Sequence, residues 1–470
     1  MCSRYHTRRI AKQTAFSGSM GVVLGIDAAN IAKAPHPDTT FMGNISRGGS
    51  AAFMSRHKSF LLLILATAFL LRFVAAIGLE HYLKNTAHRQ FLIAGDASGY
   101  WELGKRIAAF QEYAVHEPPR RVMRTPGFPA LLAVPIGLAG ASTFAARLVL
   151  AVVGTVACWL VYLLATQLFD ENVGLVAAVL TGFSPTMVGF SVLLLSETLF
   201  AATLVASLVV MALLTKRNAN HAPPIWLAVV AGIAFAAACY VRPSWMLVMP
   251  LYAVMVVCLS KDRRRVLALA VAILAGFLLA WSPWVIRNYR TTGQIVVTTL
   301  WVGPSLYDGL NPAANGDSNM TFFDRDKLMS TMSEYEMDQH YRRKAMDFVQ
   351  QNPGRTAELA MLKLIRYWKP WPNADQFNKA WHKLAVAAFF VPLAALAVWG
   401  AWLNRRQPWV LLLAVFPIFY FSAIHSIFVG SLRYRLPAEY PVSVVAAAAI
   451  CEAIRRRKKS VSTSVATSET

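Results

Sequence analysis

Charged residues are scarce in this sequence. Only 15% of its 470 residues are Asp, Glu, Lys or Arg, whereas a soluble domain carries about 25%. This scarcity excludes an ordinary soluble enzyme, a disordered protein and a nucleic-acid-binding domain with a solvated surface. Acidic residues are the rarer kind, with 24 against 46 basic residues. The net charge of +22 does not indicate nucleic acid here, because much of the excess lies in short clusters between apolar runs.

Cysteine is also rare, and its spacing marks no site. Four of the five cysteines lie inside apolar runs, and no CxxC or mixed Cys/His spacing occurs. A zinc site and a disulfide framework are therefore not supported. The motifs GxGxxG, Walker A, GxSxG and HExxH are absent as well. These absences argue against nucleotide-driven, serine-hydrolase and zincin chemistry, and they favour a mechanism without a soluble nucleotide.

Long apolar runs are what the sequence has instead. Hydrophobic residues make up 56% of the chain, and many runs approach the roughly 20 residues that a helix needs to cross a bilayer. The sequence therefore predicts an all-α polytopic membrane protein. We expect ten spans, at 59–79, 142–168, 172–190, 192–214, 224–241, 243–260, 265–286, 383–403, 407–429 and 433–454.

The apolar run 126–139 is shorter than these spans and contains three prolines. We interpret it as a re-entrant or juxtamembrane segment, because it is too short to cross comfortably. The basic clusters support this choice, since ten crossings from a cytoplasmic N-terminus place all of them on the cytoplasmic side. The clusters are Lys216-Arg217, Lys261 with Arg263 to Arg265, Arg405-Arg406, and Arg455 to Lys459. An eleventh span at 126–139 would move all four outside.

The spans divide the chain into three parts. We expect a basic cytoplasmic tail over 1–58, either disordered or upstream of the true start, a transmembrane domain over 59–454 and a second basic tail over 455–470. Two longer segments, 80–125 and 287–382, then lie outside. The second begins with irregular turns and continues as amphipathic helices, because its apolar residues recur at helical spacing.

Two acids and one deep arginine stand out among the apolar runs. Asp96 lies beside a glycine at the start of a short predicted helix, so it is either a turn or N-cap residue or a general base held at the membrane surface. Glu197 begins an apolar helix, where an acid is either favoured by the helix dipole or kept for a function. Arg72 lies well inside the first span and needs a partner or an aqueous cavity.

Arginines lie at the same outer level as the acids. Arg124 precedes a proline-rich turn, and Arg433 and Arg435 stand two residues apart where the last span begins. The planar guanidinium matches phosphate oxygens, whereas snorkelling toward headgroups is the structural alternative. We therefore expect a site at the outer membrane–water boundary. Its substrates would be a lipid anchored in the membrane and a second molecule outside.

An ordered series of short motifs runs through about 55–455. It consists of Asp96 with Tyr100, Arg124-Thr125-Pro126-Gly127-Phe128-Pro129, Ser196-Glu197-Thr198, Arg242-Pro243, Ser282-Pro283-Trp284-Val285-Ile286-Arg287-Asn288, Gly309-Leu310-Asn311-Pro312 and Arg433-Tyr434-Arg435-Leu436-Pro437. In this order the chain resembles the GT-C membrane glycosyltransferases, in particular the superfamily of dolichyl-phosphate-mannose–protein mannosyltransferases and aminoarabinose transferases. The resemblance implies a GT-C-type bundle of about 10–11 transmembrane helices, with outer-face juxtamembrane helices and a small outer loop region.

The resemblance also implies roles for individual residues. Asp96 is then the catalytic carboxylate of the first outer loop, with Glu197 as a second catalytic candidate. The implied ligands of the donor phosphate are Arg124, Arg242, Arg433 and Arg435. Further substrate-site candidates are Tyr100, Arg72, Arg287 and Asn288. No cofactor is certain and a divalent cation, Mg²⁺ or Mn²⁺, is possible, although Ala97 stands where many relatives have a second acid.

The sequence thus predicts a glycosyltransferase that moves a sugar from a polyprenyl-phosphate donor to a lipid, glycan or protein acceptor, with no nucleic-acid partner. We expect it in a bacterial inner membrane, with its active site facing the periplasm or the outside. Two alternatives stay open. A lipid-linked glycan ligase or polymerase would use a donor with two phosphates, and a transporter or flippase of polyprenyl-linked sugars would show internal symmetry.

Overall fold

In a computed structural model the chain is almost entirely helical. The structure describes residues 46–220, 223–259, 263–372, 375–377 and 379–468, and the part from Met54 onward forms one compact unit. Within these ranges there is no strand, only an isolated bridge between Val115 and Arg120. Most of the predicted tail 1–58 lies outside the described residues. The prediction of an all-α membrane protein is confirmed.

Seven helical segments of the described chain are long and apolar enough to cross a membrane. They are α1 (Ser46–Asn85), α4 (Thr143–Leu168), α7 (Glu197–Asn220), α10 (Arg263–Thr292), α15 (Ala380–Leu403), the segment Pro408–Ile427 that ends in α17 (Phe416–Ile427), and α18 (Leu432–Ser468). Three other expected spans correspond to shorter apolar helices, α5 (Glu171–Phe183), α8 (Ile225–Val241) and α9 (Val248–Leu259). These helices make the chain an integral membrane protein.

One expected span, 172–190, is not a single helix. It is divided into α5 and α6 (Pro185–Phe190) at Ser184, whose side chain accepts a hydrogen bond from the Met187 amide. The reason is local, because Pro185 has no amide proton to continue α5 and fits the first turn of a new helix. The hydrophobic run was continuous across this break, so hydropathy alone did not predict it.

The run 126–139 forms a helix of its own. This helix, α3 (Gly127–Ala139), has 13 residues, so it is about 20 Å long at 1.5 Å per residue. The hydrocarbon core of a bilayer is about 30 Å thick. α3 packs against α2 (Ala94–Ala108) at the end of the long helices, and its re-entrant or juxtamembrane position stays a prediction.

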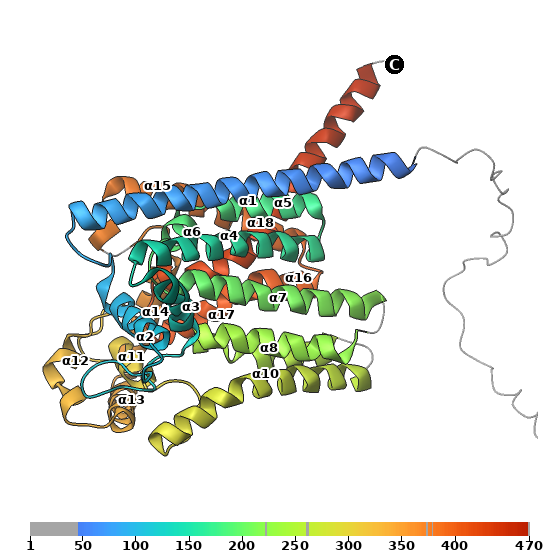
Figure 1. Ribbon diagram of the computed structural model, residues 1–470. Helices are drawn as coiled ribbons and strands as arrows, with labels where there is room; N and C mark the ends of the chain where they lie inside the picture. The colour runs from blue at the N-terminus through green and yellow to red at the C-terminus, as the bar shows by residue number, and fades with distance from the viewer. Residues whose placement is uncertain (1–45, 221–222, 260–262, 373–374, 378, 469–470) are drawn as a thin grey trace, which may run out of the picture. The chain divides into compact units, whose positions relative to one another are not determined.

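Small residues let some of the long helices approach closely. A Cβ added to Gly232 in α8 would lie 2.0 Å from the Ile273 carbonyl oxygen, and one added to Gly276 in α10 would lie 2.2 Å from that of Val229. Close backbone approach at glycine is typical of membrane helix pairs. It accounts for the tight side-by-side course of α8 and α10 (Figure 1).

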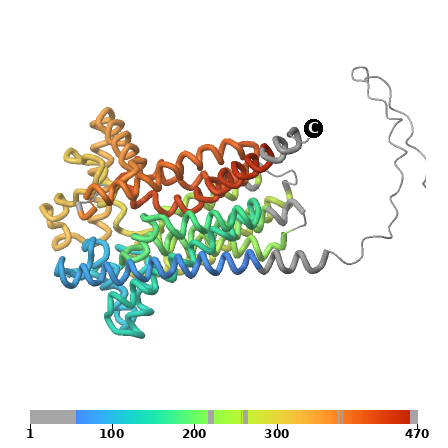
Figure 2. The backbone as a smooth tube through the Cα atoms, turned by 90° about the horizontal axis from the view of Figure 1, so that it is seen from above, coloured from blue at the N-terminus to red at the C-terminus, as the bar shows by residue number. Residues whose placement is uncertain are grey.

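In the outer segment 287–382, residues 303–309 are helical, although we expected irregular turns there. The described residues of this segment form four α-helices between α10 and α15. They are α11 (Val302–Gly309), α12 (Thr321–Asp326), α13 (Glu334–Gln351) and α14 (Pro353–Trp368). α13 begins with a capping box between Ser333 and Glu336, and Asn352-Pro353 separates it from α14. Figures 1 and 2 both place these helices at the same end of the long helices as α2.

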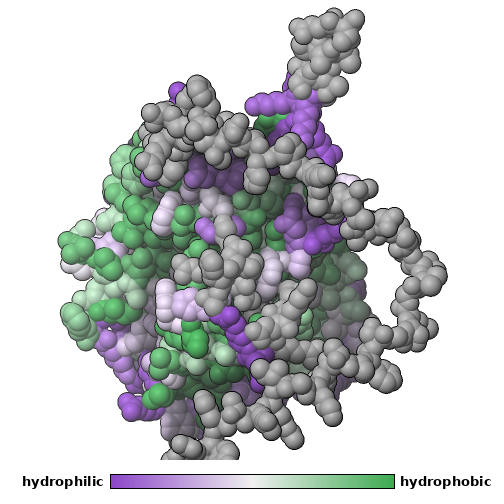
Figure 3. Space-filling view, turned by 90° about the vertical axis from the view of Figure 1, so that its right-hand side faces the viewer, coloured by the Kyte–Doolittle hydropathy of each residue, from purple (hydrophilic) through white to green (hydrophobic). Residues whose placement is uncertain are grey.

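The opposite end of the long helices carries exposed basic residues, and hydrophilic side chains gather there among apolar ones (Figure 3). The exposed basic residues include Arg264, Arg265, Arg405, Arg406 and Arg455 to Lys459. Because basic residues favour the cytoplasmic side, this end is the expected inner one. The outer segment and α2 then lie at the outer end.

Candidate active site

Asp96 lies in the first turn of α2, where it joins two arginines. Its Oδ1 accepts a hydrogen bond from Arg124 Nη2 at 2.7 Å, and its Oδ2 lies 2.7 Å from Arg433 Nη2. Ile93, rather than Asp96, occupies the N-cap position of the helix, so the interpretation as an N-cap residue was wrong. The Asp96 side chain is 31% exposed, which leaves it accessible to a ligand.

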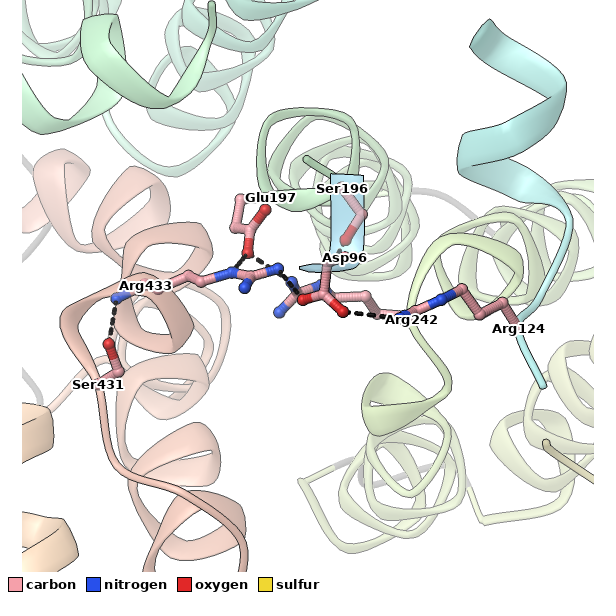
Figure 4. Close-up of polar contacts among 7 residues, drawn as sticks. All are labelled: Asp96, Arg124, Ser196, Glu197, Arg242, Ser431 and Arg433. Atoms are coloured by element: carbon pink, nitrogen blue, oxygen red, sulfur yellow. Dashed lines mark hydrogen bonds and ion pairs between the residues drawn. The ribbon is translucent and has the colours of Figure 1, made fainter. Parts of the chain in front are cut away.

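Glu197 lies on the other side of Arg433. Its Oε1 accepts hydrogen bonds from Arg433 Nε and, at 2.6 Å, from Arg242 Nη2. The Glu197 side chain is fully buried, and its Oε2 has no hydrogen-bond partner. Arg433 therefore bridges the two acids, as Figure 4 shows. We call Asp96, Arg124, Glu197, Arg242 and Arg433 the arginine–carboxylate cluster.

The ends of four helices and one loop bring these residues together. Glu197 begins α7, Arg242 follows the last residue of α8, and Arg433 is the second residue of α18. Pro243 favours an extended conformation for Arg242 and so ends the helix before it. Arg124 stands in the segment that leads into α3.

Neighbouring side chains hold the arginines in place. Arg242 Nε donates to Ser196 Oγ at 2.9 Å, and its guanidinium lies 5.5 Å from the centre of the Tyr434 ring. The Arg124 guanidinium lies 4.6 Å from the centre of the Tyr100 ring, and Arg124 Nε is buried without a hydrogen-bond partner. Cation–π contacts of this kind orient a guanidinium without neutralising it.

The cluster keeps Asp96 ionised. Burial alone would raise the pKa of Asp96, but the positive charges of Arg124 and Arg433 outweigh burial and hold this pKa well below its usual range. Three guanidinium groups face two carboxylates, which leaves one net positive charge. The cluster is therefore suited to attract an anion such as a phosphate.

Of the other predicted site residues, Tyr100 contacts the cluster, whereas Arg287 and Asn288 contact other groups. Tyr100 lies beside Arg124 and packs edge-on against Phe128. Arg287 lies over the rings of Tyr113 and Trp284 instead. Asn288 is buried and donates to the Val296 carbonyl at 3.0 Å, so it stabilises the turn after α10.

Arg72 and Arg435 are held away from the cluster. The buried Arg72 donates to the carbonyls of Gly182 and Thr181, at 3.0 and 3.3 Å, rather than to Glu197. The buried Arg435 pairs with Glu439 at 2.6 Å and donates to the Tyr367 carbonyl at 2.7 Å. Arg435 thus binds groups of the protein through Nε and Nη1, whereas its buried Nη2 has no hydrogen-bond partner. Because Arg435 contacts neither Asp96 nor Glu197, we do not count it in the site.

A buried ion pair near the outer end of α1 was missed by the sequence analysis. Arg147 Nε lies 3.0 Å from Glu80 Oε2, and Arg147 Nη1 donates to the Val192 carbonyl at 2.7 Å. The signal was a basic residue inside the apolar run 142–168, because an intramembrane charge needs a partner. Glu80 also borders a cavity of about 430 Å³, whose other lining residues include Lys84, His88, Arg89 and Thr143.

Comparison with known proteins supports the predicted resemblance. The family model described as dolichyl-phosphate-mannose-protein mannosyltransferase matches residues 123–286. This range contains Arg124, Glu197 and Arg242 of the cluster, but neither Asp96 nor Arg433. No curated protein matches the chain at a significant level.

Solved structures to which the chain is similar include an archaeal oligosaccharyltransferase and the bacterial protein ArnT. The Archaeoglobus fulgidus oligosaccharyltransferase AglB, in complex with an inhibitory peptide and a dolichol-phosphate, is 17% identical with a TM-score of 0.51 and covers 87% of this chain and 52% of its own. The apo form of the same enzyme gives the same values. ArnT from Cupriavidus metallidurans, bound to undecaprenyl phosphate, is 13% identical with a TM-score of 0.41 and covers 83% of this chain and 78% of its own.

The chain spans about half the length of the oligosaccharyltransferase that it matches. At this level of identity the likeness concerns the fold. The chain therefore has the fold of the GT-C glycosyltransferases and, over residues 123–286, the sequence pattern of the dolichyl-phosphate-mannose-protein mannosyltransferase family.

Proposed function

We propose that the chain is a membrane glycosyltransferase, which moves a sugar from a polyprenyl-phosphate donor to an acceptor on the outer face of the membrane. The observation that carries the proposal is the position of Arg433 between Asp96 and Glu197, at the expected outer end of the long helices. A lipid phosphate at the membrane surface can reach such a group from the bilayer, and an acceptor can reach it from the water. The family match and the complex of AglB with a dolichol-phosphate support the same substrate class.

The arginines would hold the donor phosphate. A guanidinium stabilises the charge that develops on a leaving phosphate, so no strong acid is needed to protonate it. Arg124 has an unused Nε–H in addition to its bond with Asp96. Arg433 and Arg242 are neutralised by carboxylates here, so a phosphate would compete with Asp96 and Glu197 for their N–H groups.

This competition would make Asp96 a better base. With two arginines bound, the pKa of Asp96 is too low for efficient proton abstraction. When Arg433 or Arg124 turns to the donor phosphate, the lost pairing raises the pKa of Asp96. Asp96 then takes the proton of the acceptor as the acceptor atom bonds to the anomeric carbon, while the bond from that carbon to the phosphate oxygen breaks and polyprenyl phosphate leaves. Attack opposite the leaving group would invert the anomeric configuration.

Glu197 would act through the arginines rather than on the substrate. Its carboxylate is fully buried, and both of its close contacts are guanidinium groups. We therefore propose that Glu197 is a positioning residue and not the second catalytic residue that the sequence analysis considered.

A divalent cation does not fit the donor set of this site. The described residues contain no group of three His, Cys, Asp or Glu side chains that could hold a metal ion. Arg433 lies between the two carboxylates of the cluster, Asp96 and Glu197, and a guanidinium repels a metal ion. We therefore propose a mechanism that depends on the arginines.

The pool of polyprenyl-linked sugars tests the proposal. Membrane lipids of a strain without this chain would be compared by mass spectrometry with strains that carry the wild type or Asp96→Asn. We expect one polyprenyl-monophosphate sugar to accumulate in the deletion and in the Asp96→Asn strain, and only the wild type to clear it. Asp324→Asn, an exposed acid of α12, is the matched control and should clear it as well.

Two other outcomes would change the conclusion. Accumulation of a diphosphate-linked oligosaccharide would favour the ligase, which the fold shared with an oligosaccharyltransferase keeps as the second candidate. An unchanged lipid pool in all strains would contradict both and favour transport. The proposed location, a bacterial inner membrane with the site facing the periplasm, is tested by where the sugar product is found.

A further inference from the structure

A short loop aims Arg433 at the two acids. This loop, residues 428–431, joins α17 to α18, and the Arg433 amide donates to Ser431 Oγ at its end. Arg433 lies in the first turn of α18, so a shift of the loop would move its guanidinium. What holds the loop therefore also determines where Arg433 points.

Lys363 of α14 reaches the start of this loop. Its side chain is fully buried, and its Nζ donates a hydrogen bond to the carbonyl of Ile427 at 2.6 Å. Burial lowers the pKa of Lys363 to about 8, against the opposing effect of the Asp308 carboxylate. Burying an amine without a partner is costly, so this bond to Ile427 is the reason that Lys363 can occupy an otherwise apolar face with Leu359 and Tyr367.

The loop backbone also packs directly on the outer segment. A Cβ added to Gly430 would lie 2.1 Å from the Lys363 carbonyl oxygen, and one added to Gly309 would lie 2.2 Å from that of Phe428. The Gly430 amide donates to the Gly316 carbonyl at 3.3 Å. α14, the end of α11 and the turn at Gly316 therefore enclose the loop.

The helices on both sides of the loop are fastened to α14 as well. Tyr367 donates through its hydroxyl to the Ile418 carbonyl of α17 at 2.9 Å, and Arg435 of α18 donates to the Tyr367 carbonyl. His425 of α17 and Tyr434 of α18 stack on each other, with their ring centres 4.3 Å apart. With its flanking helices held, the loop itself depends on the contacts of Lys363 and the glycines.

We propose that Lys363 is a positioning residue for Arg433, which holds the 428–431 loop through the Ile427 carbonyl so that Arg433 reaches Asp96 and Glu197. The consequence for phosphate binding rests on the proposed function. The contact between Lys363 and the loop does not rest on the proposed function. The contact and its consequence for phosphate binding can therefore be tested separately.

Hydrogen exchange of the full-length chain tests the contact. In Lys363→Met the Ile427 carbonyl loses its donor, and we expect faster backbone exchange in peptides that cover 428–436. The control is Lys344→Met, which removes a lysine of α13 that pairs with Asp326 at 3.4 Å and should leave this region unchanged. Unchanged exchange over 428–436 in Lys363→Met would overturn the proposal. If that variant does not fold, Lys363→Gln, which keeps a shorter donor, takes its place.

A double-mutant cycle tests whether Lys363 acts through Arg433. The readout is the affinity for undecaprenyl phosphate, and we expect Lys363→Met and Arg433→Gln each to weaken it about fivefold or more. The double variant should bind no worse than Arg433→Gln alone, because coupled residues are not additive. Lys363→Arg, which keeps a cationic donor, should restore most of the affinity.

The outcomes separate the two proposals. Additive losses in the double variant would refute a role through Arg433, because a purely structural lysine would weaken binding independently. A wild-type chain that does not bind undecaprenyl phosphate would contradict the proposed function, whereas the exchange experiment would still decide whether Lys363 holds the loop.

Discussion

Arg433 and Arg435 show how neighbours decide the role of a single side chain. The two stand two residues apart on α18, and side chains at this spacing point to different faces of a helix. Arg433 therefore faces Asp96 and Glu197, whereas Arg435 faces Glu439 and the end of α14. The sequence motif marked both arginines, but only Arg433 joins the arginine–carboxylate cluster.

The difference between the two arginines predicts different effects of the same substitution. In Arg435→Lys the lysine cannot reproduce the fork that joins Glu439 and the Tyr367 carbonyl, so we expect a loss of about 1–3 kcal/mol of stability. Its affinity for undecaprenyl phosphate should stay within about twofold of the wild type. For Arg433→Lys we expect the reverse: a clear loss of affinity for undecaprenyl phosphate and little change in stability. Thermal midpoints and lipid titrations of both variants check this, and a large affinity loss in Arg435→Lys would return that residue to the phosphate site.

The local sequence determines where the helices begin and end, and small residues determine where they contact one another. Pro185 divides an apolar run into α5 and α6. Pro243 ends α8, so that Arg242 follows the helix in an extended conformation and contacts Glu197. Glycines decide where helices meet, because only a residue without Cβ permits the backbone distances found between α8 and α10. The site depends on this packing, since Arg242 is carried by the end of α8.

A matched pair of glycine substitutions tests the contact between α8 and α10. Gly232→Ala places a Cβ 2.0 Å from the Ile273 carbonyl oxygen, so the helices must separate, at a cost of about 1–3 kcal/mol. Gly137→Ala in α3 meets no atom within 4 Å and should be neutral or slightly stabilising, because alanine favours a helix. The measurement is the thermal midpoint of each variant in the same detergent. Equal midpoints would show that the close approach is not needed.

At the scale of the whole unit from Met54 onward, the arginine–carboxylate cluster and the exposed basic residues lie at opposite ends. The cluster lies where α2 and the outer segment meet the long helices, and exposed basic residues of α10, α18 and the turn at Arg405-Arg406 lie at the other end (Figures 1 and 3). Because cytoplasmic ends of membrane helices attract Lys and Arg, we expect the cluster to face away from the cytoplasm.

Cysteine labelling in intact cells tests this orientation. In a background with Cys2→Ser and Cys258→Ser, Phe110→Cys introduces a thiol at a position that is 98% exposed at the expected outer end, and Arg406→Cys introduces one in an exposed basic turn. A membrane-impermeant maleimide should label only the first, and permeabilised cells should label both. Labelling of Arg406→Cys in intact cells would invert the topology and contradict an outward-facing site.

The sequence by itself determined the class of the protein and most of its helices, because long apolar runs are stable only as membrane or core helices. It also marked Asp96, Glu197, Arg124, Arg242 and Arg433 through the level at which they lie. Only the tertiary structure decided that these five meet. They come from segments far apart in the chain, and the contacts between them depend on helix rotation and backbone approach. Hydropathy does not say how a helix is rotated about its axis. The sequence therefore could not show that Arg72, Asn288 and Arg435 lie outside the cluster. Lys363 lacked any sequence signal, because an amphipathic helix with a lysine normally exposes it to water.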